Sequence, residues 1–270
     1  MKLKEVFYML GLKPKPKRYG HEVVDLDLTG EGRIQYAVWQ HPRSSHGRIE
    51  QGMVDELRKY LRPGDTAIDI GAQVGDTTVP MALAVGKEGT TFGLEPNGYT
   101  YPVLEANARL NQERTNILPL PFAATEEDGT YVFEYSDSGF CNGGGHDGIS
   151  RWKHGHAFRL TVEGKNLERY LRTEYPEETA KLRFLKVDAE GADASILESL
   201  SNLIAETRPF IRAEVFRHLN DEQRRRLYDA VSVHGYTVHR LNSLEDYRGD
   251  ILAPAGMKAD HTFDIFAVPG

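Results

Sequence analysis

The sequence has a single cysteine, Cys141, so no disulfide can form within the chain. So little cysteine is typical of a protein from a reducing compartment. The sequence also has no apolar run near the roughly 20 residues that a membrane span needs. Its first residues, MKLKEVFYMLGL, are too short and too charged for a secretory signal. These absences predict a cytoplasmic protein without a transmembrane segment.

The sequence also lacks an excess of positive charge. Lysine and arginine together number 33, aspartate and glutamate number 40, and the formal net charge is −7. A nucleic-acid partner usually requires a basic surface, so this balance predicts a protein that binds no nucleic acid. The length of 270 residues is enough for one large α/β domain or two small ones, and 40% apolar residues can build a core.

Residues 1–46 precede the regular part of the chain and are predicted to be an extension packed on the core. Leu3, Val6, Phe7 and Leu10 have helical spacing, which indicates a short helix against the body of the protein. The basic run KPKPKR behind them leaves open a second interpretation, an anchor at a membrane surface.

From about residue 49 the sequence alternates helix-like and strand-like segments and shows no convincing domain boundary. This rhythm predicts one α/β domain over 47–270 with a doubly wound, mostly parallel sheet. The expected helices are 49–61, 76–85 with Asp76 as the cap, 99–111, 192–206 and 221–235. The expected strands are 66–70, 89–96, 116–124, 130–135, 184–191, 209–216, 236–241 and 262–269.

One segment, at about 136–158, interrupts this rhythm and is rich in glycine and histidine. Loops of this length are usually functional or disordered, so it is interpreted as an inserted substrate loop or as a surface excursion. His154 and His156, near His146 and Asp147, leave a metal site open as a further alternative.

The stretch AIDIGAQVGDTT, residues 67–78, reads as a strand, a glycine turn and the start of a helix. A dinucleotide-binding turn would have a glycine at position 73, where this chain has Gln73, and no Lys-Ser/Thr pair follows as in a phosphate-binding P-loop. Asp69 at the end of the strand would repel a pyrophosphate and attract an ammonium group. The turn therefore favours S-adenosylmethionine, whose amino-acid end carries that charge, over a nicotinamide dinucleotide.

Glu95 supports the same ligand. It ends the next expected strand, 24 residues after Gly71, close to the roughly 20-residue spacing of a ribose-binding acid. A carboxylate there can accept hydrogen bonds from both ribose hydroxyls. The alternative is that Asp69 only caps the helix and that Glu95 is simply exposed.

A second group of acids follows the later strands. Asp188 and Glu214 each end an expected strand, and Glu190 lies just after Asp188, so the fold brings them to one crevice. Methyl transfer to a hydroxyl requires a group that accepts its proton. Asp188 is the first candidate for this base, and Glu190 and His218 are further candidates. Asp188 and Glu214 are also a possible site for a divalent cation such as Mg.

These acids also have a purely structural interpretation. They can pair with Lys186 or Arg212, or Asp193 can cap the following helix. The chain further lacks the D/N-P-P-Y/F motif of methyltransferases that act on amino groups of nucleic acids. That absence favours an oxygen acceptor.

Taken together, DTAIDIGAQVGDTT, GLEPN, FAATEEDGTYVFEY, FLKVDAEGADASILESL and AEVF resemble an FkbM-type class I S-adenosylmethionine-dependent methyltransferase over about residues 47–268. The resemblance implies a seven-stranded sheet with an antiparallel last strand, and O-methylation of a sugar hydroxyl in a glycan or glycosylated compound. It implies acceptor contacts at Asp188 and Glu190. It implies a cofactor site at Asp69, Gly71, Ala72, Gln73, Gly75, Thr77, Glu95, Pro96, Asn97, Phe122, Ala123 and Asp188.

Three alternatives to this function stay open at this point. They are an O-methyltransferase whose acceptor is a small natural product, a non-catalytic protein that binds the cofactor, and a protein that binds NAD. The sequence predicts neither the oligomeric state nor the identity of the acceptor.

Overall fold

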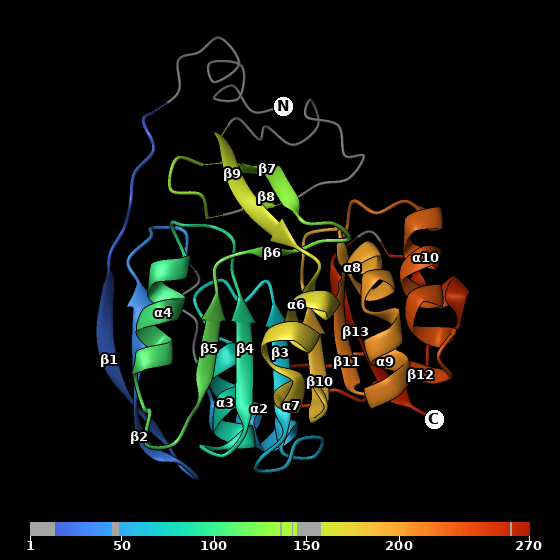
Figure 1. Cartoon of the computed structure of the whole chain (residues 1–270), viewed down its shortest axis with the longest axis horizontal. Helices are drawn as coiled ribbons and strands as arrows, with labels where there is room; N and C mark the ends of the chain where they lie inside the picture. The colour runs from blue at the N-terminus through green and yellow to red at the C-terminus, as the bar shows by residue number, and fades with distance from the viewer. Residues whose placement is uncertain (1–13, 45–48, 136, 142, 145–157, 260) are drawn as a thin grey trace.

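The computed structural model describes residues 14–44, 49–135, 137–141, 143–144, 158–259 and 261–270. Its centre is a seven-stranded sheet in the order β12-β13-β11-β10-β3-β4-β5 (Figure 1). The strands of this sheet are β3 (Thr66–Ile70), β4 (Thr90–Leu94), β5 (Ile117–Leu120), β10 (Leu182–Val187), β11 (Phe210–Val215), β12 (Tyr236–Arg240) and β13 (Phe263–Pro269). β13 runs antiparallel to both neighbours, which confirms the predicted fold with its antiparallel last strand.

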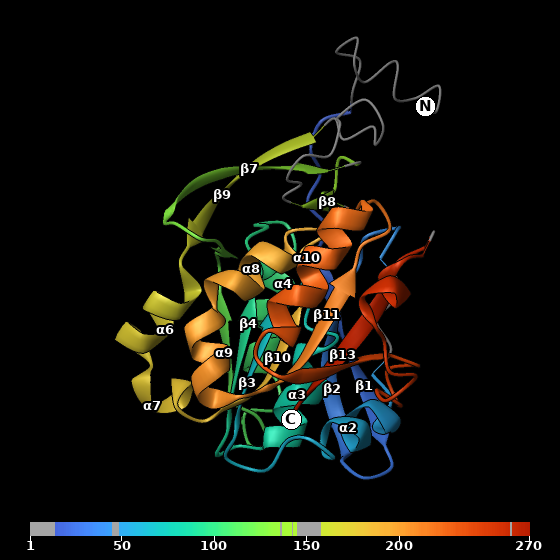
Figure 2. The same cartoon turned by 90° about the vertical axis from the view of Figure 1, so that its right-hand side faces the viewer.

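Helices cover both faces of this sheet because both faces of its strands are apolar. In β10, Leu185 and Val187 pack in one core cluster, while Phe184, the residue before Leu185, packs in another. The first face carries α8 (Asp193–Ser199), α9 (Ser201–Thr207) and α10 (Asp221–Ser232), and the second carries α2 (Gln51–Leu57) and α3 (Thr78–Val85). Figures 1 and 2 show these two layers. No helix of the described residues has the length and apolar character needed to cross a membrane.

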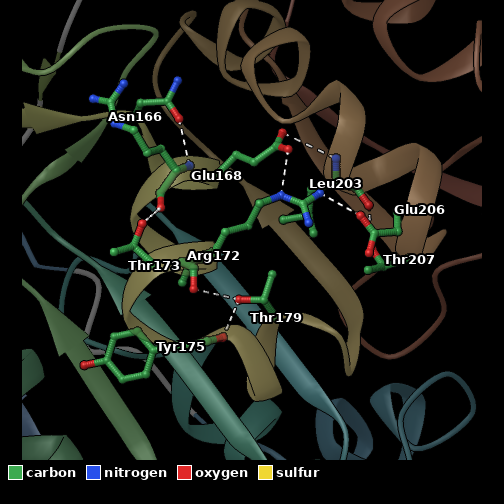
Figure 3. Close-up of polar contacts among 11 residues, drawn as sticks. Asn166, Glu168, Arg172, Thr173, Tyr175, Thr179, Leu203, Glu206 and Thr207 are labelled. Carbon is green, nitrogen blue, oxygen red and sulfur yellow. Dashed lines mark hydrogen bonds and ion pairs between the residues drawn. The ribbon is translucent and has the colours of Figure 1, made fainter.

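Two short helices that the sequence patterns did not predict, α6 (Leu167–Glu174) and α7 (Pro176–Thr179), precede β10. The side chain of Asn166 caps α6 by accepting from the backbone N–H of Arg169 at 2.9 Å. Arg172 then joins α6 to α9, because its guanidinium contacts Glu168 at 2.9 Å and Glu206 at 2.7 Å (Figure 3). These contacts hold the α6–α7 connection against the same face as α9.

Several predicted boundaries are wrong. The expected strand 116–124 is split, because Pro121 has no N–H to continue the ladder and the chain leaves the sheet after β5. The expected helix 192–206 is divided at Leu200, where the backbone has φ −99° and ψ 9°. Asp76 does not cap α3, which begins two residues later with Thr77 at the N-cap.

The chain that leaves β5 builds a second, four-stranded sheet in the order β6-β9-β7-β8. Its strands are β6 (Ala123–Ala124), β7 (Gly129–Tyr135), β8 (Gly143–Gly144) and β9 (Phe158–Lys165). The expected strand 130–135 is therefore real but lies in this sheet, antiparallel to β9. In Figure 1 the small sheet lies above the carboxyl ends of the central strands. Of the predicted loop 136–158, residues 145–157 with His146, Asp147, His154 and His156 lie outside the described residues.

An antiparallel hairpin, β1 (His21–Leu28) and β2 (Gly32–Trp39), precedes the central sheet and was not predicted. Leu28, Ile34 and Tyr36 pack with residues of α2 and α3. The expected helix at the start of the chain lies outside the described residues, and the domain boundary near 46 stays a prediction.

Two asparagine side chains join the hairpin to α4 (Tyr101–Arg109) and the residues just after it. The amide of Asn107 bonds both the N–H and the C=O of Ala37, at 2.7 and 3.1 Å. The amide of Asn111 bonds both groups of Gln35, each at 2.8 Å. One helical turn and two strand residues have similar lengths, so amides four residues apart can bond the backbone of strand residues two apart. The two amides thus supply the hydrogen bonds that a neighbouring strand would make at the edge of β2.

We predict that Asn107→Ala lowers the free energy of unfolding by about 2–4 kcal/mol. The side chain of Asn107 is 1% exposed and also donates to the carbonyl of Val74 at 2.8 Å, so its loss leaves three enclosed backbone groups without partners. Urea unfolding followed by circular dichroism measures the change. The matched control is Asn111→Gly, which keeps the left-handed backbone at φ 56° and removes the more exposed pair of bonds at a cost of about 1 kcal/mol. Equal losses in the two variants would contradict the proposed role of burial.

Candidate active site

A cavity of about 490 Å³ lies at the carboxyl ends of the central strands, beneath the small sheet. This is the position at which α/β sheets bind their ligands. The predicted residues that line it are Gly71, Gln73, Thr77, Glu95, Pro96, Phe122, Ala123, Asp188, Glu190 and Glu214. The cavity therefore joins the two groups of residues that the sequence analysis assigned to cofactor and acceptor.

The glycine turn after β3 forms one wall of the cavity and is fixed from both sides. The N–H groups of Gly71 and Ala72 donate to the carbonyl of Leu94 at 3.1 and 2.9 Å, and the N–H of Asp188 donates to the carbonyl of Ile70 at 3.1 Å. Gly71 has φ 78°, and a Cβ there would come within 2.0 Å of the carbonyl oxygen of Asp188. Only glycine allows the turn to approach β10 this closely.

Gln73 has the left-handed backbone, φ 49°, at the position where a dinucleotide-binding turn has its second glycine. Its side chain lines the cavity and donates to the carbonyl of Cys141 at 3.4 Å. A glutamine side chain thus occupies the space that a close-lying pyrophosphate requires. This geometry argues against the alternative of NAD binding.

Asp69 is fully enclosed and does not line the cavity. Its Oδ2 accepts from the hydroxyls of Thr77 and Thr78 at 2.6 and 2.7 Å, and its Oδ1 lies 3.0 Å from the ammonium of Lys186. Asp69 therefore holds the start of α3 and the ammonium of Lys186. This placement is close to the alternative in which Asp69 only caps the helix. Ala72 and Gly75 also lie outside the cavity lining, as parts of the turn.

Asp76 lines the cavity instead, although the sequence analysis assigned it to helix capping. Burial raises the pKa of its carboxyl, and the charge of Lys186 opposes this shift. The position of Asp76 directly after Gly75, at the end of the glycine turn, was the sequence signal for a place at the cavity. Asp76 is the carboxylate of this turn that a bound ammonium group can reach.

Glu95 follows β4 and lines the cavity while only 7% exposed. Burial raises the pKa of its carboxyl to about 7, and hydrogen bonds from the backbone of Asn97 and the side chain of Thr100 oppose the shift. One of these bonds, from Asn97 N–H to Oε1, measures 2.8 Å. Asn97 itself is enclosed, and its side-chain amide donates to the carbonyl of Phe140 at 2.8 Å rather than lining the cavity.

Lys186 of β10 lies between the two halves of the site and was assigned only a structural role from the sequence. Its ammonium lies 3.0 Å from Asp69, 3.4 Å from Asp188 and 3.0 Å from the carbonyl of Gly71. Burial lowers the pKa of Lys186, but the charges of Asp69 and Asp188 outweigh this effect and raise it above its ordinary value. Lys186 is therefore charged, and it orients Asp188 at the cavity wall.

The remaining acids surround Asp188. Glu190 has a left-handed backbone at φ 53°, and burial together with the charge of Asp188 raises its pKa to about 7. Burial and the same charge also raise the pKa of Glu214. Asp193 stabilises the loop that carries Glu190, accepting from the N–H groups of Ala189 and Gly191 at 3.2 and 3.1 Å.

The structure places His218 and Arg212 differently from the sequence predictions. His218 is exposed and contacts Phe216 and Arg217, and it does not line the cavity. Arg212 lines the cavity but pairs with Asp264 at 2.6 Å rather than with Glu214.

Within the described residues, no three histidine, cysteine or acidic side chains come together as metal ligands, so a divalent cation at Asp188 and Glu214 stays a prediction. The ammonium of Lys186 already supplies a positive charge beside Asp188.

Aromatic side chains of β7 form the opposite wall of the cavity and were not predicted. Tyr131, Phe133 and Tyr135 alternate along the strand and all line the cavity, whereas Val132 between them is 52% exposed. Burial raises the pKa of the Tyr135 hydroxyl, and the charges of Glu95 and Glu190 raise it further. The sequence signal was this period-two pattern in TYVFEY.

The chain resembles known methyltransferases in sequence. The profile of the methyltransferase FkbM domain matches residues 69–247. A fibrillarin-like rRNA/tRNA 2′-O-methyltransferase from Thermococcus onnurineus is 31% identical over 119 residues, which are 44% of this chain and 48% of that protein. The rRNA 2′-O-methyltransferase fibrillarin from Rattus norvegicus is 28% identical over 109 residues, 40% of this chain and 32% of its own length. The chain thus spans half or less of these curated relatives.

Two solved structures are also similar. A methyltransferase FkbM from Methylobacillus flagellatus KT has a TM-score of 0.47 at 13% identity, over 76% of this chain and 44% of its own. Aeropyrum pernix fibrillarin, solved with natively bound S-adenosyl-L-methionine, has a TM-score of 0.44 at 14% identity, over 94% and 96% of the two chains.

The sheet topology and the domain match define a class I S-adenosylmethionine-dependent methyltransferase. Within that class, the chain belongs to the FkbM methyltransferase family.

We predict that Glu95→Gln weakens the binding of S-adenosylhomocysteine about tenfold or more, because the sequence analysis predicts that the charged carboxylate of Glu95 accepts from the ribose hydroxyl groups. Isothermal titration calorimetry at pH 8, where Glu95 is ionised, measures this affinity. The control is Glu127→Gln, an exposed neighbour of the cavity that should leave the affinity unchanged. Near-normal affinity in Glu95→Gln would remove Glu95 from the cofactor site.

Proposed function

We propose that this methyltransferase is an O-methyltransferase whose acceptor is a sugar hydroxyl in a glycan or glycoconjugate. The observation that carries the proposal is the single cavity that extends from Glu95 to Asp188, Glu190 and Glu214 under the aromatic side chains of β7. A cofactor at one end and an acceptor at the other would then share one space. The cytoplasmic location inferred from the cysteine content stays a prediction.

The cofactor half has the donors and acceptors that S-adenosylmethionine needs. In the proposal, Glu95 accepts from the ribose hydroxyls, and Asp76 attracts the ammonium. Phe122, just before β6, and Ala123 of β6 contact the adenine. When bound, the cofactor supplies a methyl group activated by its sulfonium charge. The chain must then align the acceptor oxygen with that group and remove its proton.

Asp188 is the proposed base. It follows β10 directly, its side chain is 41% exposed, and the ammonium of Lys186 at 3.4 Å orients it. Glu190 is the second candidate, since a pKa of about 7 suits proton transfer near neutral pH. His218 lies outside the cavity lining and is a weaker candidate.

The chemistry of the lining favours a sugar. Carboxylates accept hydrogen bonds from hydroxyl groups, and the cavity has several of them, including Asp188, Glu190 and Glu214. Aromatic rings such as Phe133 and Tyr135 offer flat apolar surfaces to the C–H faces of a sugar ring. A small natural product with a hydroxyl group would use the same chemistry, so it remains the nearest alternative.

A second candidate acceptor is the ribose 2′-hydroxyl of an RNA, because the curated relatives are named rRNA/tRNA 2′-O-methyltransferases. The charges of this site do not favour it. The two cations of the cavity lining, Lys186 and Arg212, pair with Asp69 and Asp188 and with Asp264. The neighbouring acids would repel a phosphate backbone.

Transfer of a radioactive methyl group from S-adenosylmethionine tests these acceptors side by side. The panel contains methyl glycosides, an oligosaccharide mixture and total RNA. We predict labelled glycosides and unlabelled RNA, whereas labelled RNA alone would overturn the sugar assignment. Cofactor binding with no transfer to any acceptor would support the non-catalytic alternative.

We predict that Asp188→Asn lowers kcat at least 100-fold while the affinity for S-adenosylhomocysteine changes less than about threefold, since the proton acceptor is lost and the cofactor contacts remain. Single-turnover methyl transfer and calorimetry give the two values. Asp264→Asn, which removes a carboxylate paired with Arg212, serves as the control for a general change of charge. Unchanged turnover in Asp188→Asn would exclude this residue as the base.

We predict that kcat/KM of the wild type rises with pH through about 7 and then levels off. The pKa of Glu190 is raised to about 7, so its carboxyl is protonated below that pH and becomes a charged acceptor above it. In Glu190→Gln this limb should disappear from the pH profile. A persisting limb would assign the titration to another group, of which Glu95 is the first to examine because its pKa is also about 7.

A further inference from the structure

A short segment between β7 and β8, residues 137–141, borders the cofactor half of the cavity, and its Cys141 lines that cavity. The carbonyl of Phe140 accepts from the side chain of Asn97 at 2.8 Å, and the carbonyl of Cys141 accepts from Gln73 at 3.4 Å. Asn97 in turn donates its N–H to Glu95. The segment therefore bonds to both turns that form the cofactor site, the one after β3 and the one after β4.

The segment needs an anchor, because its own backbone is strained. Phe140 has φ 56°, which a residue with a side chain rarely adopts. Asp137 stabilises this turn by accepting from the N–H groups of Gly139 at 2.9 Å and Cys141 at 3.2 Å. The ring of Phe140 stacks on Tyr99 with centroids 4.3 Å apart.

The anchor comes from the N-terminal hairpin. His41, two residues after β2, places Nε2 3.1 Å from Oδ1 of Asp137. Its ring is 3% exposed and stacks on Trp39 at 4.6 Å. A Cβ on Gly139 would come within 2.2 Å of the same Nε2, so the segment lies directly against the ring.

The tautomer of His41 follows from its two contacts. The N–H of Arg43 donates to Nδ1 at 3.1 Å, so Nδ1 is an acceptor and Nε2 carries the proton. Burial lowers the pKa of His41. The carboxylate of Asp137 partly opposes this shift, and the charge of Arg43 adds to it. The neutral ring thus donates from Nε2 to Asp137.

We propose that His41 is a positioning residue for the cofactor site, acting through Asp137 on residues 137–141 and through their carbonyls on Gln73 and Asn97. The inference rests on the cofactor assignment of the proposed function. His41 lies outside the matched family domain, which begins at Asp69. The proposal therefore extends the cofactor site to a residue of the N-terminal part of the chain.

Two substitutions of His41 separate this role from simple packing. His41→Phe keeps a ring against Trp39 and removes the donor, whereas the amide of His41→Gln restores a donor near the position of Nε2. We expect the dissociation constant of S-adenosylhomocysteine to rise about tenfold in His41→Phe and to return to within about threefold of the wild type in His41→Gln. Equal affinity of His41→Phe and wild type, or equal loss in both variants, would overturn the proposal.

Two further variants guard against a general loss of folding. Gln40→Ala changes the exposed neighbour of His41 and should leave affinity unchanged. Gly139→Ala pushes the segment away from His41 without altering the hairpin and should weaken binding as His41→Phe does. Thermal unfolding of each variant is measured alongside, and wild-type affinity in a folded Gly139→Ala would contradict the proposal.

Cys141 provides a second readout that does not depend on cofactor binding. It is the single cysteine of the chain, it is 8% exposed, and burial raises the pKa of its thiol to about 11. Its reaction with 5,5′-dithiobis(2-nitrobenzoate) should be slow in the wild type and at least tenfold faster in His41→Phe. Equal rates would show that His41 does not hold the segment.

The two readouts distinguish the possible failures. If no variant and not even the wild type binds S-adenosylhomocysteine, the proposed function fails, and the thiol rates alone decide whether His41 holds the segment. If the wild type binds it and His41→Phe binds it equally well, the positioning role fails while the proposed function stands.

Discussion

The buried ammonium of Lys186 is the interaction on which the rest of the site depends. It lies 3.0 Å from Asp69 and 3.4 Å from Asp188, and it bonds the carbonyl of Gly71. A buried charge of this kind is costly unless it is fully paired, and removing one partner of such a group typically costs several kcal/mol. Lys186 therefore links three parts of the molecule, the end of β3, the glycine turn and the residue that follows β10. The position of the cofactor wall and the position of the proposed base are set by one cation.

This arrangement divides the acids by what surrounds them. Asp69 is enclosed and its charge is used within the protein, so it is not available to a ligand. Glu95 and Glu190 lie at the cavity with pKa values of about 7, because burial removes water and few cations replace it. A bound sulfonium compound brings positive charge into this acid-rich space, which favours the ionised forms of these carboxyls. The electrostatics thus suit a cationic cofactor and a neutral, hydroxyl-bearing acceptor.

The central sheet and the two acidic groups could be predicted from the sequence, because strand-terminal acids and glycine turns depend on local pattern and on strand order. What could not be predicted depends on contacts between distant segments. The sequence analysis assigned ligand binding to Asp69 and helix capping to Asp76. Only the fold shows that Lys186 and two threonine hydroxyls enclose Asp69. The N-terminal hairpin was missed although Val24, Leu26 and Leu28 alternate with polar residues, and so was the small sheet, whose β6 and β9 pair across about 40 residues of chain.

The most direct test of the account is a crystal structure of the protein with S-adenosylhomocysteine. The account predicts the ribose at Glu95, the amino group near Asp76 and the glycine turn, and the sulfur facing Asp188 across the cavity, with Lys186 still between Asp69 and Asp188. A nucleoside bound away from Glu95, or a Lys186 that leaves Asp69 to contact the ligand, would contradict it.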